Sequence, residues 1–356
     1  MDFAWNFGVM PYGIRWRQHR RAFHQYLNHA VVKLYHPIMH EETRSFLRKV
    51  KSQPDDIFEH LDSHAYQKIS LFGTEIMRVA YGFDDIRRNG ALIRNAEALV
   101  LGFLEAAVPG RLLVNMFPFL RHVPSWFPGA GFKRFLRKLS RISFRTLYQP
   151  FEEAKNDFAN GKKGSYPSMA ASLIDKLPED GDVNRVEQES IARNVCGVAY
   201  VAGAETTVSL GLALLYVLAS YPDVQSKAQV QIDSVVGPNR LPAVTDIQDL
   251  PYVHAIVKEV SRWFTVVPLG VAHSNSEDDE YDGFFIPKGT IIFQNNWAIM
   301  HNPDVFDKPF EFIPERYLKD GQIDPSVPDA ETAAFGHGRR YALREVGWTN
   351  TYGILS

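Results

Sequence analysis

NVCGVAYVAGAETTVSLGLALLYVLAS, residues 194–220, is the longest apolar run of this chain. A run of this length, rich in Val, Ala and Leu, is typical either of a membrane span or of the central helix of a large helical core. Glu205 lies near its middle, where a charge would cost a lone membrane span about 2.5 to 3.5 kcal/mol. The run therefore predicts a buried helix around which the rest of the chain is organised, with a membrane span as the alternative.

The AGAETT segment inside this run carries groups that a buried helix rarely holds unless they are paired or used. Ala202 and Gly203 remove side-chain bulk from one patch, so that a flat group can approach the backbone there. Thr206 can turn its hydroxyl back to the carbonyl of Ala202, four residues earlier. Together with Glu205 this predicts a small cleft with an acid and an alcohol, suited to delivering protons. The alternative is a helix-packing notch in which Thr206 bonds to its own helix and Glu205 meets an arginine.

Composition and charge describe an ordinary globular protein. The 356 residues are 45% hydrophobic and carry a formal net charge of −2, which excludes a disordered or nucleic-acid-coating chain. The single cysteine, Cys196, excludes an internal disulfide framework, so we expect a reducing compartment. The first residues, MDFAWNFGVMPYG, lack the basic and apolar regions of a signal peptide or membrane anchor.

Apolar residues recur with helical spacing through most of the chain. We expect helices over residues 12–34, 64–82, 91–108, 221–236 and 251–264, with a surface connector at 160–182. Residues 280–293, EYDGFFIPKGTIIF, alternate short β-rich runs with DG and PKG turns, which predicts a small antiparallel ribbon. The predicted fold class is therefore mainly α with a minor antiparallel β region.

Prolines, glycines and aromatic residues gather between residues 108 and 131, where they prevent a long helix. This segment is a candidate lid or membrane-touching loop. The following KRFLRKLSRISFR, residues 133–145, carries six basic and no acidic side chains. It either rests on an anionic lipid surface or forms a solvated helix face.

Two sets of charged residues have spacings that predict contacts. Trp16 and Arg20 are four apart on an amphipathic helix and can hold an anion, unless the cation simply lies over the indole. Glu259 and Arg262 are three apart and face the same way, and FIPERY brings Arg316 after a proline-rich approach. A carboxylate between two guanidiniums can be buried with both sides hydrogen-bonded, so these three residues predict a triad that pins a helix to a loop.

Six segments then agree in their order along the chain: WRQHRR at 16–21, AGAETT at 202–207, KEVSRW at 258–263, PLGVAH at 268–273, FEFIPERY at 310–317 and AFGHGRR at 334–340. In this order they resemble the haem-thiolate monooxygenases, the cytochromes P-450. The residues in and around these segments are most similar to those of fungal membrane-anchored members. The resemblance covers nearly the whole chain and implies a single cytochrome P-450-like helical domain over residues 1–356. It also implies insertion of one oxygen atom of dioxygen into a lipophilic small molecule, with NADPH electrons from a reductase. For the full-length family member it implies the cytosolic face of the endoplasmic reticulum membrane, and a chain without the anchor could be cytosolic.

The resemblance also implies a role for each matching residue. Binding of the haem propionates falls to Trp16, Arg20, His273 and Arg340. The face of the haem where dioxygen binds is covered by Ala202 and Gly203, with Glu205 and Thr206 relaying protons. Glu259, Arg262 and Arg316 become a structural triad, and Phe335, Gly336 and Gly338 begin the loop that presents the thiolate to iron.

The chain departs from the family at that loop. The pattern F-x-x-G-x-R-x-C-x-G begins at Phe335 and holds through Arg340, but Ala342 stands at the Cys position and Arg344 at the Gly position. From residue 341 onward nothing resembles the family, so we expect a chain truncated at both ends, with a shifted reading frame or a misplaced exon boundary. Cys196 would lie on the distal side and is expected to be a small buried hydrophobe. The alternative to an active monooxygenase is therefore a catalytically dead remnant or a scaffold for lipophilic ligands.

Overall fold

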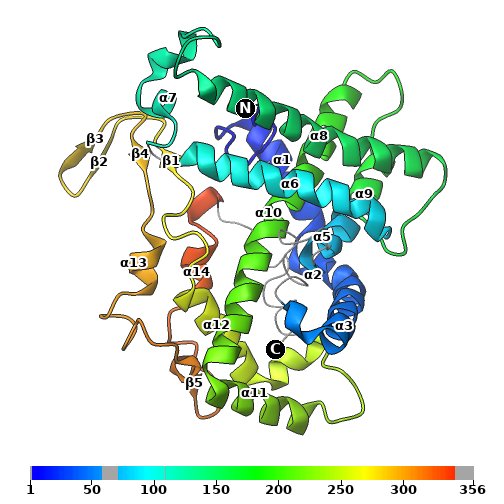
Figure 1. Ribbon diagram of the computed structural model, residues 1–356, viewed down its shortest axis with the longest axis vertical. Helices are drawn as coiled ribbons and strands as arrows, with labels where there is room; N and C mark the ends of the chain where they lie inside the picture. The colour runs from blue at the N-terminus through cyan, green and yellow to red at the C-terminus, as the bar shows by residue number, and fades with distance from the viewer. Residues whose placement is uncertain (1, 58–70, 109, 341–356) are drawn as a thin grey trace. The chain divides into compact units, whose positions relative to one another are not determined.

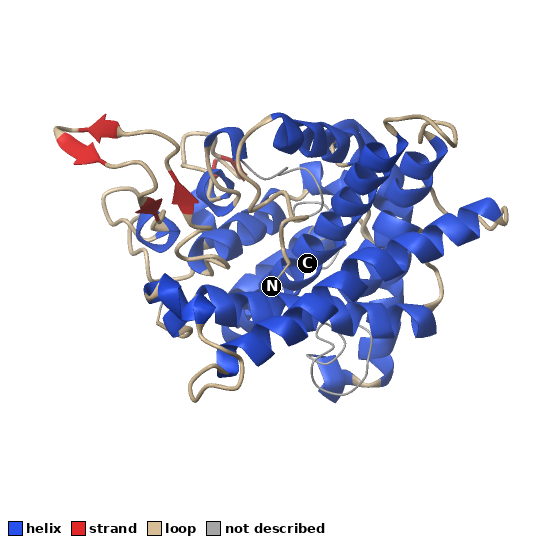
Figure 2. Cartoon of the chain, turned by 90° about the horizontal axis from the view of Figure 1, so that it is seen from above, coloured by secondary structure: helices blue, strands red, loops and turns tan. Residues whose placement is uncertain are grey.

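The computed structural model describes residues 2–57, 71–108 and 110–340 (Figure 1). These residues form helices joined by loops, and their strands form two-stranded antiparallel sheets (Figure 2). The prediction of a mainly α fold with a minor antiparallel β region is confirmed. Two compact units divide the chain inside one long helix: the N-terminal unit, residues 1–208, and the C-terminal unit, residues 209–356. The single domain over residues 1–356 stays a prediction.

The described helices that begin in the N-terminal unit are α1 (Ile14–Tyr26), α2 (His29–Val32), η1 (Lys33–Tyr35), α3 (His36–Ser52), η2 (Pro54–Asp56), α5 (Leu71–Tyr81), α6 (Ile86–Ala107), α7 (Leu113–Met116), η3 (Pro118–His122), α8 (Gly131–Ala159), α9 (Met169–Asp175) and α10 (Arg185–Ser220). As expected, residues 108–131 hold no long helix, and the connector at 160–182 holds one short helix. Of the helix predicted at 64–82, residues 64–70 lie outside the described part of the chain.

The first helix is shorter than its periodicity predicts, and the expectation of one helix over residues 12–34 is wrong. α1 ends at Tyr26, and Asn28 starts α2, accepting hydrogen bonds from the backbone N–H groups of Ala30 and Val31 at 3.0 and 3.2 Å. Asparagine is a preferred N-cap because its side chain replaces the missing helical acceptor. The amphipathic pattern runs through this cap and therefore conceals the break.

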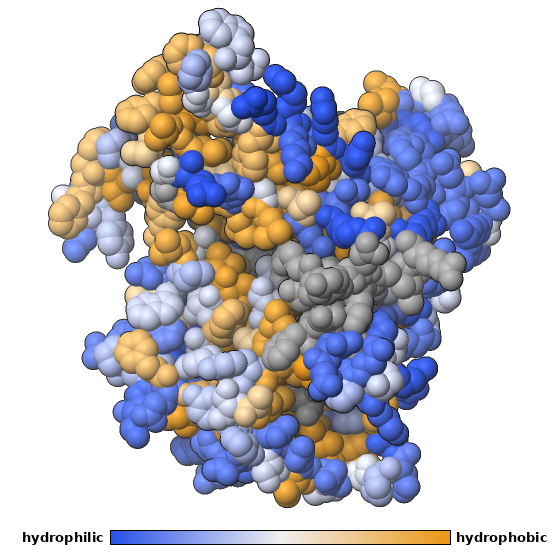
Figure 3. Space-filling view, viewed as in Figure 1, coloured by the Kyte–Doolittle hydropathy of each residue, from blue (hydrophilic) through white to orange (hydrophobic). Residues whose placement is uncertain are grey.

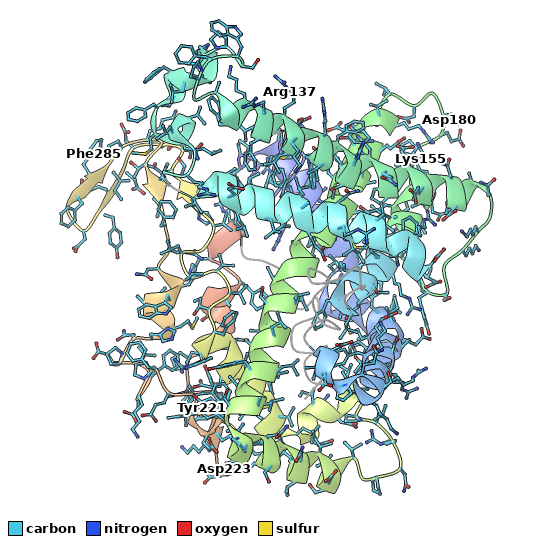
Figure 4. All side chains as sticks on the ribbon, in the orientation of Figure 1. Arg137, Lys155, Asp180, Tyr221, Asp223 and Phe285 are labelled. Carbon is cyan, nitrogen blue, oxygen red and sulfur yellow. The ribbon has the colours of Figure 1, made fainter. Side chains whose placement is uncertain are left out.

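The core of the N-terminal unit lies where α5 and α10 meet. Every α10 residue from Ile191 to Val201 except Arg193 is buried, and the Tyr200 ring meets the edge of Tyr81 of α5 at a centroid distance of 6.1 Å. Lys155 of α8 (Figure 4) donates to Glu189 of α10 at 2.7 Å. Among the described residues, α10 is the one helix long and apolar enough to cross a membrane, and a buried core helix passes the same test. The burial of residues 191–201 favours the core helix.

A buried arginine joins three segments of the same unit. Arg78 of α5 forms ion pairs with Glu41 and Glu42 of α3, each at 2.8 Å, and with Asp84 at 2.9 Å. Asp84 also accepts hydrogen bonds from the backbone N–H and the hydroxyl of Ser165 in the connector, both at 2.8 Å. The guanidinium tolerates burial because each of its three nitrogens donates to an ionised carboxylate.

The C-terminal unit is arranged around α12 (Pro251–Trp263), nearly all of whose residues are buried. Its other described elements are α11 (Pro222–Val235), η4 (Val244–Asp249), β1 (His273–Ser274), β2 (Asp279–Tyr281), β3 (Phe284–Ile286), β4 (Ile291–Ile292), α13 (Asn296–Met300), η5 (Pro314–Tyr317), β5 (Leu318–Lys319), β6 (Gln322–Ile323), α14 (Glu331–Ala334) and η6 (Gly338–Arg340). The helices predicted at 221–236 and 251–264 are confirmed as α11 and α12.

The predicted ribbon is also confirmed, as an antiparallel hairpin of β2 and β3. Asp282 and Gly283 form its turn with φ angles of 51° and 78°, the paired left-handed conformation of a type I′ hairpin. β4 pairs instead with β1, so that His273 lies opposite Ile292. This pairing fixes the backbone position of His273, which the sequence predicts to bind the cofactor.

Candidate functional site

The structure brings Glu259, Arg262 and Arg316 together in the C-terminal unit. Arg262 donates from Nε to Glu259 Oε2 at 2.7 Å and from Nη2 to Oε1 at 2.8 Å, a bidentate pair in which both side chains are 0% exposed. Arg316 Nε lies 3.1 Å from both carboxylate oxygens. The carboxylate thus lies between two guanidiniums, the arrangement that makes burial of such charges tolerable.

Backbone groups complete this triad, and sequence reasoning missed them. Arg262 Nη1 donates to the carbonyls of Met300 at 2.9 Å and Pro309 at 2.8 Å, and Glu259 Oε1 accepts from the N–H of Ile313 at 2.9 Å. Arg316 Nη1 donates to the carbonyl of Asp307 at 2.7 Å. The triad therefore holds the irregular segment 300–316 against α12, a scaffolding geometry with no group left for chemistry.

Trp16 and Arg20 lie one turn apart on α1, as their spacing requires. Trp16 is buried and Arg20 is half-buried. Burial lowers the pKa of the Arg20 guanidinium, which remains charged at neutral pH because an arginine ordinarily titrates far above neutrality. A donor N–H and a partly desolvated cation at this spacing fit a carboxylate.

The C-terminal unit carries the remaining nominated cofactor contacts on separate elements. His273 is an exposed residue of β1, and Arg340 ends η6 half-buried, with its pKa lowered by burial. Phe335 is half-buried just after α14, and Gly336 and Gly338 follow with φ angles of 82° and 61°. Residues other than glycine rarely adopt these angles, which explains both glycines in the segment that leads to residue 341. Ala342, at the expected thiolate position, lies outside the described residues.

The AGAETT segment forms a local irregularity on α10. Thr206 Oγ1 donates to the carbonyl of Ala202 at 2.8 Å, the back-bond that the sequence predicts. Gly203 contacts Ile76 of α5 so closely that an added Cβ would lie 3.0 Å from Ile76 Cδ1. Gly203 therefore packs closely against α5, while Ala202 is exposed and Thr206 is half-buried. The Glu205 side chain lies outside the described part.

One polar contact of the N-terminal unit was not predicted from the sequence. His19 lies between Trp16 and Arg20 in the WRQHRR motif and contacts Asn194 of α10 with its Nε2, 3.0 Å from Asn194 Nδ2. His19 and Asn194 are 0% and 2% exposed. The available signal was a histidine on the apolar stripe of an amphipathic helix, which requires a buried partner.

The residues present fit part of a haem site. The donors of Trp16 and Arg20 match a haem carboxylate in charge and spacing. For the iron, the described residues contain no cluster of His, Cys, Asp and Glu side chains that could hold a metal. The single cysteine, Cys196, is fully buried, and burial raises the pKa of its thiol far above neutrality. A protonated thiol is not an iron ligand, so Cys196 does not fit the thiolate role.

Comparisons with known proteins agree with this arrangement. A family model described as Cytochrome P450 matches residues 7–341. Cytochrome P450 monooxygenase COX1 of Coprinopsis cinerea is 54% identical over 340 residues, which cover 96% of this chain and 64% of that protein. Cytochrome P450 monooxygenase COX2 of the same fungus is 40% identical over 361 residues, 100% of this chain and 67% of that protein. Tryptamine 4-monooxygenase of Psilocybe cyanescens is 33% identical over 342 residues, which cover 96% of this chain and 65% of that protein. The chain spans about two thirds of the length of these relatives, and it belongs to the cytochrome P450 family.

Proposed function

We propose that this chain forms the body of a haem-dependent monooxygenase that inserts one oxygen atom of dioxygen into a lipophilic small molecule. The family and the relatives named as monooxygenases support the reaction class. The observation that carries the proposal is the donor pair on α1, a buried indole and a half-buried guanidinium one turn apart. The Trp16 ring also packs against Tyr12 at a centroid distance of 5.2 Å, and the indole N–H and the guanidinium together fit a haem carboxylate.

Haem, when bound, supplies the activation of dioxygen, which side chains cannot perform. The chain's own residues bind the haem and orient it. Trp16 and Arg20 hold one carboxylate through charge-assisted hydrogen bonds, and His273 and Arg340 offer the same donor chemistry on the C-terminal unit. Phe335 and Gly338 belong to the turn that leads toward the position of the iron ligand.

Proton delivery is assigned to Glu205 and Thr206. The Thr206 hydroxyl donates its proton to the Ala202 carbonyl, so its oxygen lone pairs remain available to accept a hydrogen bond from a neighbouring donor. Rotation of the Thr206 side chain about χ1 would break its hydrogen bond to the Ala202 carbonyl and let the hydroxyl donate to another acceptor on the exposed side of α10. Glu205, which directly precedes Thr206 in the chain, would then return a proton to the hydroxyl.

Electrons are proposed to come from NADPH through a cytochrome reductase, as in the family. The substrate is proposed as lipophilic, because the family acts on such molecules. The name of the Psilocybe cyanescens relative specifies tryptamine for that protein.

We also propose that the chain works at the cytosolic face of the endoplasmic reticulum membrane and touches it through residues 113–127. Phe119 and Trp126 are 67% and 80% exposed there, and Leu113, Met116, Phe117 and Phe127 are exposed as well. The surface over α7 is accordingly hydrophobic (Figure 3). Arg137 (Figure 4) lies on the basic segment of α8 that follows, and its charge suits anionic headgroups. Sedimentation with anionic vesicles should fall for Trp126→Ser and stay unchanged for Tyr281→Ser of the hairpin; equal binding of all three proteins contradicts the assignment.

A second function is favoured by one specific observation. Ala342 stands where the motif requires cysteine, and the chain's single cysteine is a buried thiol. A methyl group cannot donate electron density to iron, the feature that favours O–O cleavage in this family. In this second proposal, the chain binds haem or lipophilic ligands and performs no oxygen insertion.

The two functions are separated by one set of variants reconstituted with haemin. We expect the chain itself to bind haemin without giving the reduced, carbon-monoxide-bound absorption band that names the family. Ala342→Cys combined with Arg344→Gly restores the motif and should produce that band, whereas Ala342→Ser with Arg344→Gly should not. A band in the unmodified chain that disappears in Cys196→Ala would assign the iron ligand to Cys196 and overturn the second function. Failure of every variant to bind haemin would overturn the haem-dependent proposal.

A further inference from the structure

The hydrogen bonds of His19 determine its protonation state. Nδ1 lies 2.7 Å from the carbonyl oxygen of Arg15, which can only accept, so Nδ1 carries a hydrogen and donates. Nε2 lies 3.0 Å from Nδ2 of Asn194, which can only donate, so Nε2 is an unprotonated acceptor. These contacts fit a neutral imidazole in the Nδ1–H tautomer, with both ring nitrogens satisfied.

The place of this ring joins two helices that carry proposed functional residues. His19 lies on the buried stripe of α1 together with Trp16 and Tyr26, and its ring packs against Phe7 at a centroid distance of 6.1 Å. Its partner Asn194 lies in the buried half of α10. The bond spans 175 positions of sequence and lies entirely within the N-terminal unit.

We propose that His19 is a positioning residue that locks α1 onto α10 through Asn194 and thereby holds Trp16 and Arg20 in place for an anionic carboxylate group. Trp16 precedes His19 by three residues and Arg20 follows it directly, so rotation or sliding of α1 moves all three together. A donor pair loses much of its affinity when it is misplaced by a fraction of an ångström, because charge-assisted hydrogen bonds depend on direction. The carboxylate is that of haem if the proposed function holds, on which this part of the inference rests.

The test uses the full chain with two nearly isosteric replacements of His19. His19→Gln can place Oε1 near the position of Nε2 and keep the bond from Asn194. His19→Asn can keep the bond to the Arg15 carbonyl but falls short of Asn194. Asn89→Ala is the matched control, because Asn89 is 0% exposed and donates to the Phe83 carbonyl at 2.8 Å on α6. It removes a buried hydrogen bond of equal quality without touching α1.

Haemin titration of the apoprotein, followed by absorbance, gives the first readout. We expect His19→Gln to bind within about twofold of the parent and His19→Asn to bind roughly tenfold more weakly, the effect of one buried hydrogen bond. Asn89→Ala should lose stability and keep its haemin affinity. Equal affinity of His19→Asn and the parent, or an equal loss in Asn89→Ala, overturns the positioning role.

A second readout is independent of haem. In the apoprotein, amide hydrogen exchange across residues 14–26 should accelerate in His19→Asn and remain slow in His19→Gln. In nitrogen-15 spectra of labelled histidine, the signal that disappears in His19→Gln should be a neutral ring protonated at Nδ1. A ring protonated at Nε2 overturns the tautomer assigned to His19, and exchange unchanged in His19→Asn overturns the lock itself. A parent chain that binds no haemin while the exchange result holds overturns the proposed function and leaves the lock established.

Discussion

Replacing Glu259 by alanine is the perturbation whose consequence the structure determines most directly. The carboxylate accepts hydrogen bonds from Nε and Nη2 of Arg262, from Nε of Arg316 and from the backbone N–H of Ile313. Its removal leaves the fully buried guanidinium of Arg262 beside that of Arg316, which is 9% exposed, with no counter-charge between them. Like charges and an unsatisfied N–H then act together in a buried site.

The expected loss follows from what remains in the site. Breaking a buried ion pair by removing one partner costs about 3 to 5 kcal/mol, because the remaining charge is left uncompensated. Arg262 keeps its bonds to the carbonyls of Met300 and Pro309, which places the loss at the lower end, about 3 kcal/mol. Glu259→Gln keeps the shape but removes the charge, and its loss should fall between zero and that of alanine.

Urea unfolding measures this loss, and Glu311→Ala is the control. Glu311 lies in the same segment, and its carboxylate is 3.8 Å from Lys308 Nζ with both side chains 60% exposed, so its removal should cost less than about 0.5 kcal/mol. Tryptophan fluorescence is a local reporter, since the Trp263 indole donates to the Phe310 carbonyl at 2.9 Å. A loss of 3 kcal/mol lowers the midpoint by roughly 1 to 2 M urea for a typical slope. Equal midpoints for Glu259→Ala and Glu311→Ala would refute the reasoning.

Three further predictions concern the N-terminal unit. Burial is the largest effect on His19, and it lowers the pKa of the imidazole; the charge of Arg15 also lowers this pKa, while the hydrogen bond to the Arg15 carbonyl and the charge of Glu187 raise it. The net pKa of His19 is lowered in the folded chain, so the unfolded chain gains a proton near pH 6.5 that the folded chain does not. Stability should therefore fall as the pH drops below about 6.5, and His19→Gln should flatten that slope in urea midpoints measured at several pH values. Arg78→Met leaves three carboxylates together and should cost about 2 to 3 kcal/mol, with faster proteolysis of the connector near Ser165; unchanged proteolysis would show that Arg78 does not hold it. Thr206→Ala, in the variant with the restored cysteine, should increase the NADPH consumed per product formed, and unchanged coupling would mean that Thr206 only satisfies the Ala202 carbonyl.

Local sequence signals were sufficient for the elements and contacts that local geometry controls. Glu259 and Arg262 are one helical turn apart, so their pairing follows from periodicity, and the back-bond of Thr206 follows from its spacing to Ala202. The turn of the β2–β3 hairpin was predictable because Asp-Gly tolerates positive φ at both central positions.

The remaining features depend on contacts that no short window of sequence contains. The acceptors of Arg262 are carbonyls of an irregular loop, and backbone groups are the same at every residue. Gly203 faces Ile76, which is far away in sequence, so a notch for a ligand and a notch for packing look alike until the fold is known. The bond between His19 and Asn194 is of the same kind. Asn28 shows a different limit: it caps α2, but the apolar pattern continues across it, so periodicity alone predicts one helix.

The contacts of this chain separate its folding from its chemistry. In the triad, every described charge is met by another protein group, so the segment around Arg316 is held whether or not a cofactor is present. The bond between His19 and Asn194 is likewise complete within the protein, and it prepares α1 before any ligand arrives. Because α1 is already ordered, less conformational entropy is lost when a ligand binds to it. The contacts of the triad and of His19 do not include residue 342, so the chain with Ala342 should fold as stably as the Ala342→Cys variant.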